Sequence, residues 1–182
     1  MCTYDTRTRP EPVIAAARAA HSIVSMELAN RPSPEYVDPA AFLADPLARV
    51  PATPTMPACK AVTVLDPNEL KQTRHLLEAR ARWYSAVPSS TIERFLIAVN
   101  EVTENGLVHG GPPVRVTLWP DVERLTCLVE DAGPGTLDPM TGFRHPGAEA
   151  EHMGLWMARQ LVDDLFIENS PALGCSVLLI AT

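Results

Sequence analysis

The sequence predicts an α+β fold, an α/β sandwich in which helices pack on one face of a mixed β-sheet. One observation behind this is a pair of consecutive helical patterns, in which apolar residues recur every three or four positions between residues 67 and 108. The other is a set of short apolar segments with the length and composition of strands, at 60–65, 114–119, 125–130, 164–168 and 175–181. Helices and strands that share one stretch of chain are expected to form two layers around one core.

The first strand is followed by two helices. Asp66 and Pro67 form a capped helix start with proline at the first helical position. The helix that follows has an apolar stripe made of Leu70, Thr73, Leu77, Ala81 and Tyr84. After Pro88, the segment from Ser90 to Glu93 has the spacing of a capping box and starts a second helix over 91–108. Its apolar stripe consists of Ile92, Phe95, Leu96, Val99, Val102 and Leu107.

The C-terminal half is predicted to contain two strand pairs and a third helix. The strands at 114–119 and 125–130 form a hairpin around Pro120 and Asp121. Residues 135–151 are rich in proline and glycine and are expected to form a mobile lid. A helix at 155–162 leads to the last two strands. We expect three tryptophans to be core or partly buried anchors: Trp83, Trp119 and Trp156. Cys127 and Cys175 are expected to be small buried hydrophobic residues.

Composition restricts the classes of function. With 182 residues, 46% of them hydrophobic, the chain can form one core plus an appendage. A net charge of −7 argues against nucleic acid as the direct partner and favours a protein. No apolar run reaches the ~18 residues of a membrane span. The four cysteines form no C-x-x-C pair, which indicates neither a zinc site nor a disulfide framework and suits the reducing cytoplasm.

Proline divides the chain into two parts. Nine of the 18 prolines lie between Pro10 and Pro57, and residues 44–58 hold too many breakers for regular structure. We therefore predict a helical N-terminal segment with a proline-rich linker over residues 1–58, and one folded domain over residues 59–182. Within the first part, residues 13–24 are expected to form an amphipathic helix.

The helix at 91–108 carries the first candidate site. At about 100° per residue, Glu101, Asn105 and His109 fall along one edge of it. A carboxamide oxygen is a hard, neutral ligand for Mg²⁺, and a nearby carboxylate can orient or deprotonate an attacking hydroxyl, so the edge suits a magnesium–phosphate site. Any solvated helix face is polar too, which is the simpler interpretation. His109 is expected to fix the helix end by hydrogen bonding.

A second polar motif follows the strand at 125–130. Asp131 begins the sequence Asp-Ala-Gly-Pro-Gly, which by itself is an ordinary turn signal. A carboxylate at a strand end can accept a hydrogen bond from an exocyclic amine, and Gly133 and Gly135 allow the backbone to approach a flat base. Together with the Glu101–Asn105 edge upstream, this motif indicates a nucleotide site.

Four segments resemble, in order and spacing, the motifs of one family. The segment from Glu101 to Asn105, with the Leu-Val-His-Gly that follows, resembles the N-box of the histidine-kinase-like (Bergerat-fold) ATPases. Residues 131–135 resemble the first glycine box, residues 154–163 the end of the second glycine box and its helix, and residues 173–179 the closing strand. Within the family, the chain looks most like the bacterial anti-sigma-factor serine/threonine kinases. The resemblance extends from about residue 60 to residue 182.

The resemblance implies ATP and Mg²⁺ as cofactors and a role for each site residue. In this family the N-box glutamate acts as base or polariser, the asparagine binds Mg²⁺ and the first-box aspartate recognises adenine. These roles carry over to Glu101, Asn105 and Asp131. The base and phosphate contacts are expected at three glycines: Gly133, Gly135 and Gly154.

The chain departs from the family pattern at three places. It has His152 where related kinases usually have glycine, Ala150 between two glutamates where they often have arginine nearby, and Cys175 where threonine is common. A helix N-terminus at Gly154 can still receive phosphate through its free N–H groups. Carboxylates beside a polyphosphate are unfavourable unless cations offset them. ATP binding is therefore better supported than phosphoryl transfer.

The leading prediction is a cytoplasmic anti-sigma regulatory factor that phosphorylates a small antagonist, or anti-anti-sigma, protein and also binds a sigma factor. The alternative is a non-catalytic, ATP-gated partner-binding regulator. The ATP-binding half of a sensor histidine kinase fits less well, because the short, proline-broken N-terminal segment offers His21 but no phosphoacceptor helix pair. The oligomeric state stays open, a homodimer included.

Residues 31–46 weakly resemble the end of a sensory domain that precedes this ATPase in some bacterial regulators. A complete domain of that kind would need well over ~100 residues, on typical domain sizes. We therefore expect either that the chain is a fragment or that the appendage is vestigial.

Overall fold

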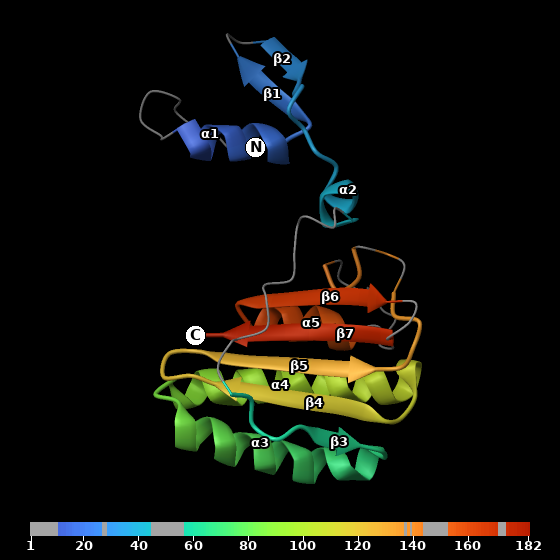
Figure 1. Ribbon diagram of the computed structural model, residues 1–182. Coiled ribbons are helices and arrows are strands. Elements are labelled where there is room, and N and C mark those ends of the chain that lie inside the picture. The colour runs from blue at the N-terminus through green and yellow to red at the C-terminus, as the bar shows by residue number, and fades with distance from the viewer. Residues whose placement is uncertain are drawn as a thin grey trace. The chain divides into compact units, whose positions relative to one another are not determined.

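Figure 1 shows the computed structural model of the chain, which describes residues 11–26, 29–44, 57–136, 138, 140–143, 153–170 and 174–182. The chain divides into two compact units, Met1–Ala48 and Arg49–Thr182. The boundary predicted between residues 58 and 59 falls after this division. Most of the predicted linker lies outside the described residues.

The N-terminal unit mixes helices with a hairpin, whereas the sequence predicted a helical segment. Its elements are α1 (Glu11–Ala20), β1 (Ile23–Met26), β2 (Ala29–Pro32) and α2 (Pro39–Ala44). The helix predicted at 13–24 ends at Ala20, because the β-branched Ile23 and Val24 pair with β2 in an antiparallel ladder. The Ser33 hydroxyl donates a hydrogen bond to the carbonyl of Arg18 at 2.8 Å, which ties the end of the hairpin to α1.

The second unit confirms the α+β sandwich. Its strands form one five-stranded sheet in the order β3-β4-β5-β7-β6, and three helices lie on one face of it (Figure 1). In chain order the elements are β3 (Val62–Val64), the 3-10 helix η1 (Pro67–Glu69), α3 (Leu70–Tyr84), α4 (Ser89–Asn105), the π-helical turn η2 (Gly106–Gly110), β4 (Val114–Pro120), β5 (Leu125–Asp131), α5 (Met153–Leu161), β6 (Asp164–Ser170) and β7 (Gly174–Ala181).

The described sheet is antiparallel at every strand pair, whereas the sequence predicted a mixed sheet. A strand–helix–strand unit such as β5-α5-β6 normally places two parallel strands side by side. Here β7 inserts between them and pairs antiparallel with both, so that Ser176 lies opposite Glu130 on one side and Glu168 on the other. The two parallel strands are thus present but are not neighbours.

Helix α4 begins differently from the sequence prediction. It starts directly after Pro88, whose carbonyl accepts hydrogen bonds from the first turn, and no side chain caps it. Glu93, predicted as the capping-box partner of Ser90, instead forms an ion pair with Arg82 of α3, with a nitrogen–oxygen distance of 3.5 Å. The predicted capping box is therefore wrong, because a tertiary contact between the two helices engages its glutamate. By contrast, the predicted cap at Asp66 is confirmed.

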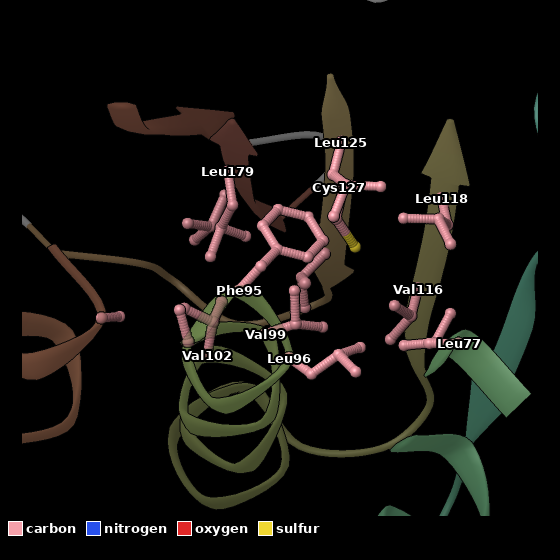
Figure 2. Packing of buried hydrophobic residues seen from close by; sticks show 14 of the residues in the cluster. Leu77, Phe95, Leu96, Val99, Val102, Val116, Leu118, Leu125, Cys127 and Leu179 are labelled. Carbon is pink, nitrogen blue, oxygen red and sulfur yellow. The ribbon is translucent and has the colours of Figure 1, made fainter. Parts of the chain in front are cut away.

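Alternating sheet residues and one stripe of each helix enclose the core. On the three central strands, every second residue faces the helices, as the period of a strand requires: Val114, Val116, Leu118, Leu125, Cys127, Val129, Cys175, Val177, Leu179 and Ala181. Figure 2 shows Phe95 of α4 directed at this face, beside Leu179 and Cys127. The predicted apolar stripe of α4 is buried throughout, which confirms it.

The prediction of a buried tryptophan is wrong for Trp83. This side chain is 81% exposed, while Thr73, Leu77 and Ala81 form the buried stripe of α3. Trp83 follows Ala81 by two residues, a rotation of ~200°, which turns it away from the sheet. Tyr84, expected in the buried stripe, is the last residue of the helix and is exposed too.

Candidate functional site

Helix α4 carries Glu101 and Asn105 one turn apart, next to the start of α5. The two helices pack against each other, and both side chains are partly exposed, while Val102 between them is buried. A Cβ placed on Gly154 would lie 3.2 Å from Glu101 Oε2 and 3.0 Å from Asn105 Nδ2. Three residues predicted for the site, from two helices about fifty positions apart in the chain, therefore lie together.

The first turn of α5 adds backbone donors to this group. Gly154 is the second residue of α5, and the N–H groups of a first helical turn have no partner within the helix. The positive end of the helix dipole lies there as well. A carboxylate, a carboxamide and a helix N-terminus that meet at one point can together hold a metal-bound phosphate group.

Burial and a neighbouring carboxylate perturb Glu101. Removal from solvent is the main cause that raises the pKa of its carboxyl group, and the nearby charge of Glu104 raises it further. A raised pKa brings a carboxylate closer to the range in which it can accept a proton during a reaction. The environment of Glu101 thus suits a base better than that of an ordinary exposed glutamate.

Asp131 lies at the end of β5, on the side of the helices. It continues the alternation of Leu125, Cys127 and Val129, all of which face the core. Its carboxylate fills the space beside two glycines of η2: a Cβ on Gly106 would lie 3.3 Å from Oδ2, and one on Gly110 would overlap the carboxylate. The end of the N-box helix and the first glycine box therefore meet around Asp131.

Gly106 and Gly110 were not predicted as site residues. Gly106, which lies inside the helix predicted over 91–108, was the available signal, because glycine in a helix needs a packing reason. The π-helical turn to which both glycines belong is also wider than an α-helical turn. His109 lies in this turn and is exposed.

The surroundings of Asp131 are partly desolvated. Burial raises the pKa of its carboxyl group, and a hydrogen bond from the Gly133 N–H to Oδ1, 2.8 Å long, acts in the opposite direction. Cys175 lies opposite Asp131 in the β5–β7 ladder. Burial and the Asp131 charge raise the pKa of this thiol to about 11, so it stays protonated at neutral pH. The Asp131 carboxylate therefore has a small neutral side chain, the Cys175 thiol, as its cross-strand neighbour.

Asn169 of β6 is a further residue of the site that the sequence did not single out. Its Nδ2 donates a hydrogen bond to the carbonyl of Thr136, just after the first glycine box. Gly135 has a φ of +67°, and a Cβ there would overlap the Asn169 side chain. Asn169 thus connects the first glycine box to the edge strand β6. The sequence around Asn169 contains no pattern that predicts this contact.

The described part of the predicted lid contacts α5. The guanidinium of Arg159 lies over the ring of Phe143, 3.8 Å from its centroid, and donates a hydrogen bond to the carbonyl of Leu165 at 2.6 Å. Burial lowers the pKa of Arg159 to about 10, so it remains charged at neutral pH. The departures at Ala150 and His152 lie outside the described residues.

The described residues contain no group of three or more His, Cys, Asp or Glu side chains that could hold a metal ion. At nucleotide sites Mg²⁺ is held by one or two protein ligands together with phosphate oxygens. Asn105 beside the α5 N-terminus fits such a ligand set, and its role as a ligand stays a prediction. No helix of the described residues is long and apolar enough to cross a membrane.

One family model matches the part of the chain that carries this geometry. The family model of the histidine kinase-like ATPase domain matches residues 63–180, from β3 to β7, which supports ATP binding. The matched segment includes Glu101, Asn105, Asp131 and the glycines around them. No curated protein matches the chain. Because the family model covers more than half of its residues, the chain belongs to the histidine kinase-like ATPase domain family.

Proposed function

We propose that the protein is an ATP-binding anti-sigma regulatory factor that acts as a Mg²⁺-dependent serine/threonine kinase on a small antagonist, or anti-anti-sigma, protein. The observation that carries this proposal is the placement of Glu101 beside Asn105 and Gly154. A site that only binds ATP gains nothing from a carboxylate next to the phosphates, because like charges repel. A kinase gains a base for the attacking hydroxyl.

In the proposed reaction, the hydroxyl oxygen of a serine or threonine of the partner attacks the γ-phosphorus, the bond to the bridging oxygen breaks, and ADP leaves. Glu101 orients the hydroxyl and accepts its proton. Asn105 supplies a carboxamide ligand to Mg²⁺, which neutralises phosphate charge when it is bound. The N–H groups at Gly154 bind phosphate oxygens. Catalysis therefore depends on positioning and charge compensation.

Asp131 determines the specificity for adenine in this proposal. Its carboxylate accepts a hydrogen bond from the exocyclic amine of adenine, whereas guanine would present a carbonyl oxygen to it. Gly133 and Gly135 let the backbone approach the face of the base. The cytoplasmic partners that fit an acidic kinase of this type are a sigma factor and its antagonist protein, and the regulated process is transcription.

A non-catalytic, ATP-gated binding module is the second candidate. Ala150 and His152 favour it, because related kinases have arginine and glycine in this region. Bound nucleotide would then order a segment that forms a partner-binding surface, and no phosphoryl group would be transferred. The ATP-binding half of a sensor histidine kinase remains a weaker third candidate.

The test of the proposed function is incubation of the full chain with γ-labelled ATP, Mg²⁺ and each small antagonist protein encoded near its gene. We expect label on a serine or threonine of one of them. Absence of label on every candidate, together with nucleotide-dependent binding of one, would support the gated module and contradict the kinase.

Replacing Asp131 by asparagine is expected to weaken ATP binding by about 1–3 kcal/mol, the cost of mismatching a partly buried polar contact. The preference for ATP over GTP should shrink as well, because the asparagine amide can donate to a carbonyl oxygen. Titration calorimetry measures both affinities. Asp121→Asn is the matched control, since this exposed carboxylate lies between β4 and β5, at the end of β5 opposite to Asp131. Equal affinities of the parent protein for ATP and GTP would refute the assignment.

Replacing Asn105 by alanine is expected to remove the magnesium dependence of ATP affinity and to leave the fold intact, since Asn105 is partly exposed and outside the core cluster. Thermal melts with ATP, with and without Mg²⁺, measure this, because a ligand that binds the folded state raises the melting temperature. Asn100→Ala, five residues earlier on α4, should keep the magnesium-linked shift. If Asn105→Ala also keeps the full shift, the metal assignment is wrong.

A further inference from the structure

Helix α3 has a second apolar stripe on the side opposite its buried one. Leu76, Ala79 and Trp83 are spaced at i, i+3 and i+7 and are exposed, Trp83 at 81% and Leu76 at 41%. The core needs only the stripe through Thr73, Leu77 and Ala81. A large, rigid aromatic side chain exposed on a helix beside other apolar residues is typical of a protein–protein contact.

The charge of α3 is opposite to that of the rest of the chain. The helix carries four cationic side chains against one carboxylate, Glu78, which gives a net charge of +3. The cations are Lys71, Arg74, Arg80 and Arg82. Since the whole chain has a net charge of −7, the residues outside α3 sum to −10. A cationic helix with an outward apolar stripe is therefore set into an acidic protein.

A further cationic residue, Lys60, lies next to the helix, at the edge of the sheet. Arg80 Nη1 donates a hydrogen bond to the carbonyl of Lys60 at 2.7 Å, which places the chain just before the edge strand β3 beside α3. Lys60 and Lys71 are both exposed, and they are the only lysines of the chain. One lysine of the chain therefore lies on α3 and the backbone of the other lies next to it.

The Trp83 end of this surface lies far from the nucleotide site. Arg82, next to Trp83, donates a hydrogen bond to the Ser89 hydroxyl at 2.9 Å, so the C-terminus of α3 adjoins the first residue of α4. Asn105 is the last residue of α4, sixteen positions on, or ~24 Å along the helix axis. A ligand at Trp83 therefore does not touch Glu101 or Asn105.

We infer that the outer face of α3, defined by Leu76, Ala79 and Trp83, is a docking surface for an acidic protein segment that carries an apolar anchor residue. Charge complementarity selects this occupant. A second copy joined by a two-fold axis would place the +3 helix against itself, which like-charge repulsion opposes. The inference goes beyond the proposed function, because it requires neither phosphoryl transfer nor bound nucleotide.

The experiment uses the full chain and a fluorescent synthetic helical peptide with leucines on one face and glutamates on the others. A second peptide with lysine in place of glutamate is the charge control. We expect the acidic peptide to bind, the basic one not to bind, and affinity to fall as salt is added. Trp83→Ala should raise the Kd of the acidic peptide by at least ~10-fold, as expected for a central aromatic anchor. Val108→Ala, an apolar side chain that is 65% exposed on η2, should leave it unchanged.

Two further measurements locate the contact. A carbodiimide couples peptide carboxylates to lysine amines, so crosslinks at Lys60 or Lys71 that form with the parent protein and are lost in Trp83→Ala, mapped by mass spectrometry, would support the surface. Asp131→Asn should bind the acidic peptide as the parent does, which separates failure of this inference from failure of the nucleotide site. Equal binding of both peptides, or no effect of Trp83→Ala, would overturn the inference. So would light scattering that shows a dimer in the parent and a monomer in Trp83→Ala, because a second copy would then occupy the surface.

Discussion

Replacing Glu101 by alanine is expected to lower the rate of phosphate transfer by ~10²–10⁴-fold, the usual contribution of a positioned acid–base group. ATP affinity should stay close to that of the parent, because Glu101 acts on the attacking hydroxyl and removal of its charge costs no phosphate contact. The physical basis is its place beside Asn105 and Gly154. Single-turnover transfer to the partner and calorimetry of ATP binding measure the two effects separately.

Glu104 offers a matched control for Glu101. It lies on the same helix, is exposed, and its charge raises the pKa of Glu101. Glu104→Gln should therefore keep the maximal rate and move the acidic limb of the pH–rate profile to lower pH, because the Glu101 carboxylate would then persist to lower pH. Glu101→Gln should be as inactive as Glu101→Ala.

The Glu101 variants also separate the two leading functions. Transfer that is lost in Glu101→Ala while nucleotide-dependent partner binding persists supports the kinase. The kinase proposal would be contradicted if the parent protein transfers no phosphate to any partner while the parent and Glu101→Ala show the same ATP-dependent partner binding. The gated binding module would then be the function that remains.

Replacing Phe95 by alanine is expected to lower the free energy of unfolding by about 3–5 kcal/mol, the usual cost of truncating a fully buried aromatic residue. Phe95 is 0% exposed and is directed from α4 at the centre of the sheet, beside Leu179 and Cys127 (Figure 2). The truncation removes contacts from both layers at once and leaves a cavity that neither layer can fill without moving.

Urea unfolding followed by circular dichroism measures this loss. Trp83→Ala is the control, since an exposed side chain of similar size should change stability by no more than ~0.5 kcal/mol. A loss below ~1 kcal/mol for Phe95→Ala would show that the helix layer does not depend on this contact, against the packing described here.

Local patterns in the sequence were enough to predict most of the secondary structure, and the motifs were enough to predict the ATPase-domain family. The stripe of α4 and the alternation on β5 repeat with the periods of a helix and a strand, so each residue's side of its element follows from its neighbours. The same periodicity places Glu101 and Asn105 on one edge and turns Asp131 toward the helices. These properties depend on residues a few positions apart, which a sequence displays directly.

Only the tertiary structure decided which of these edges meet. Glu101 and Asn105 adjoin Gly154 because α5 packs beside α4, and Asp131 fits into η2 because Gly110 lacks a side chain. The insertion of β7 between β5 and β6 and the exposure of Trp83 depend likewise on how whole layers pack. Periodicity reports the side of an element on which a residue lies, but the neighbour on that side is chosen by the free energy of the complete core, to which residues far apart in the chain contribute together.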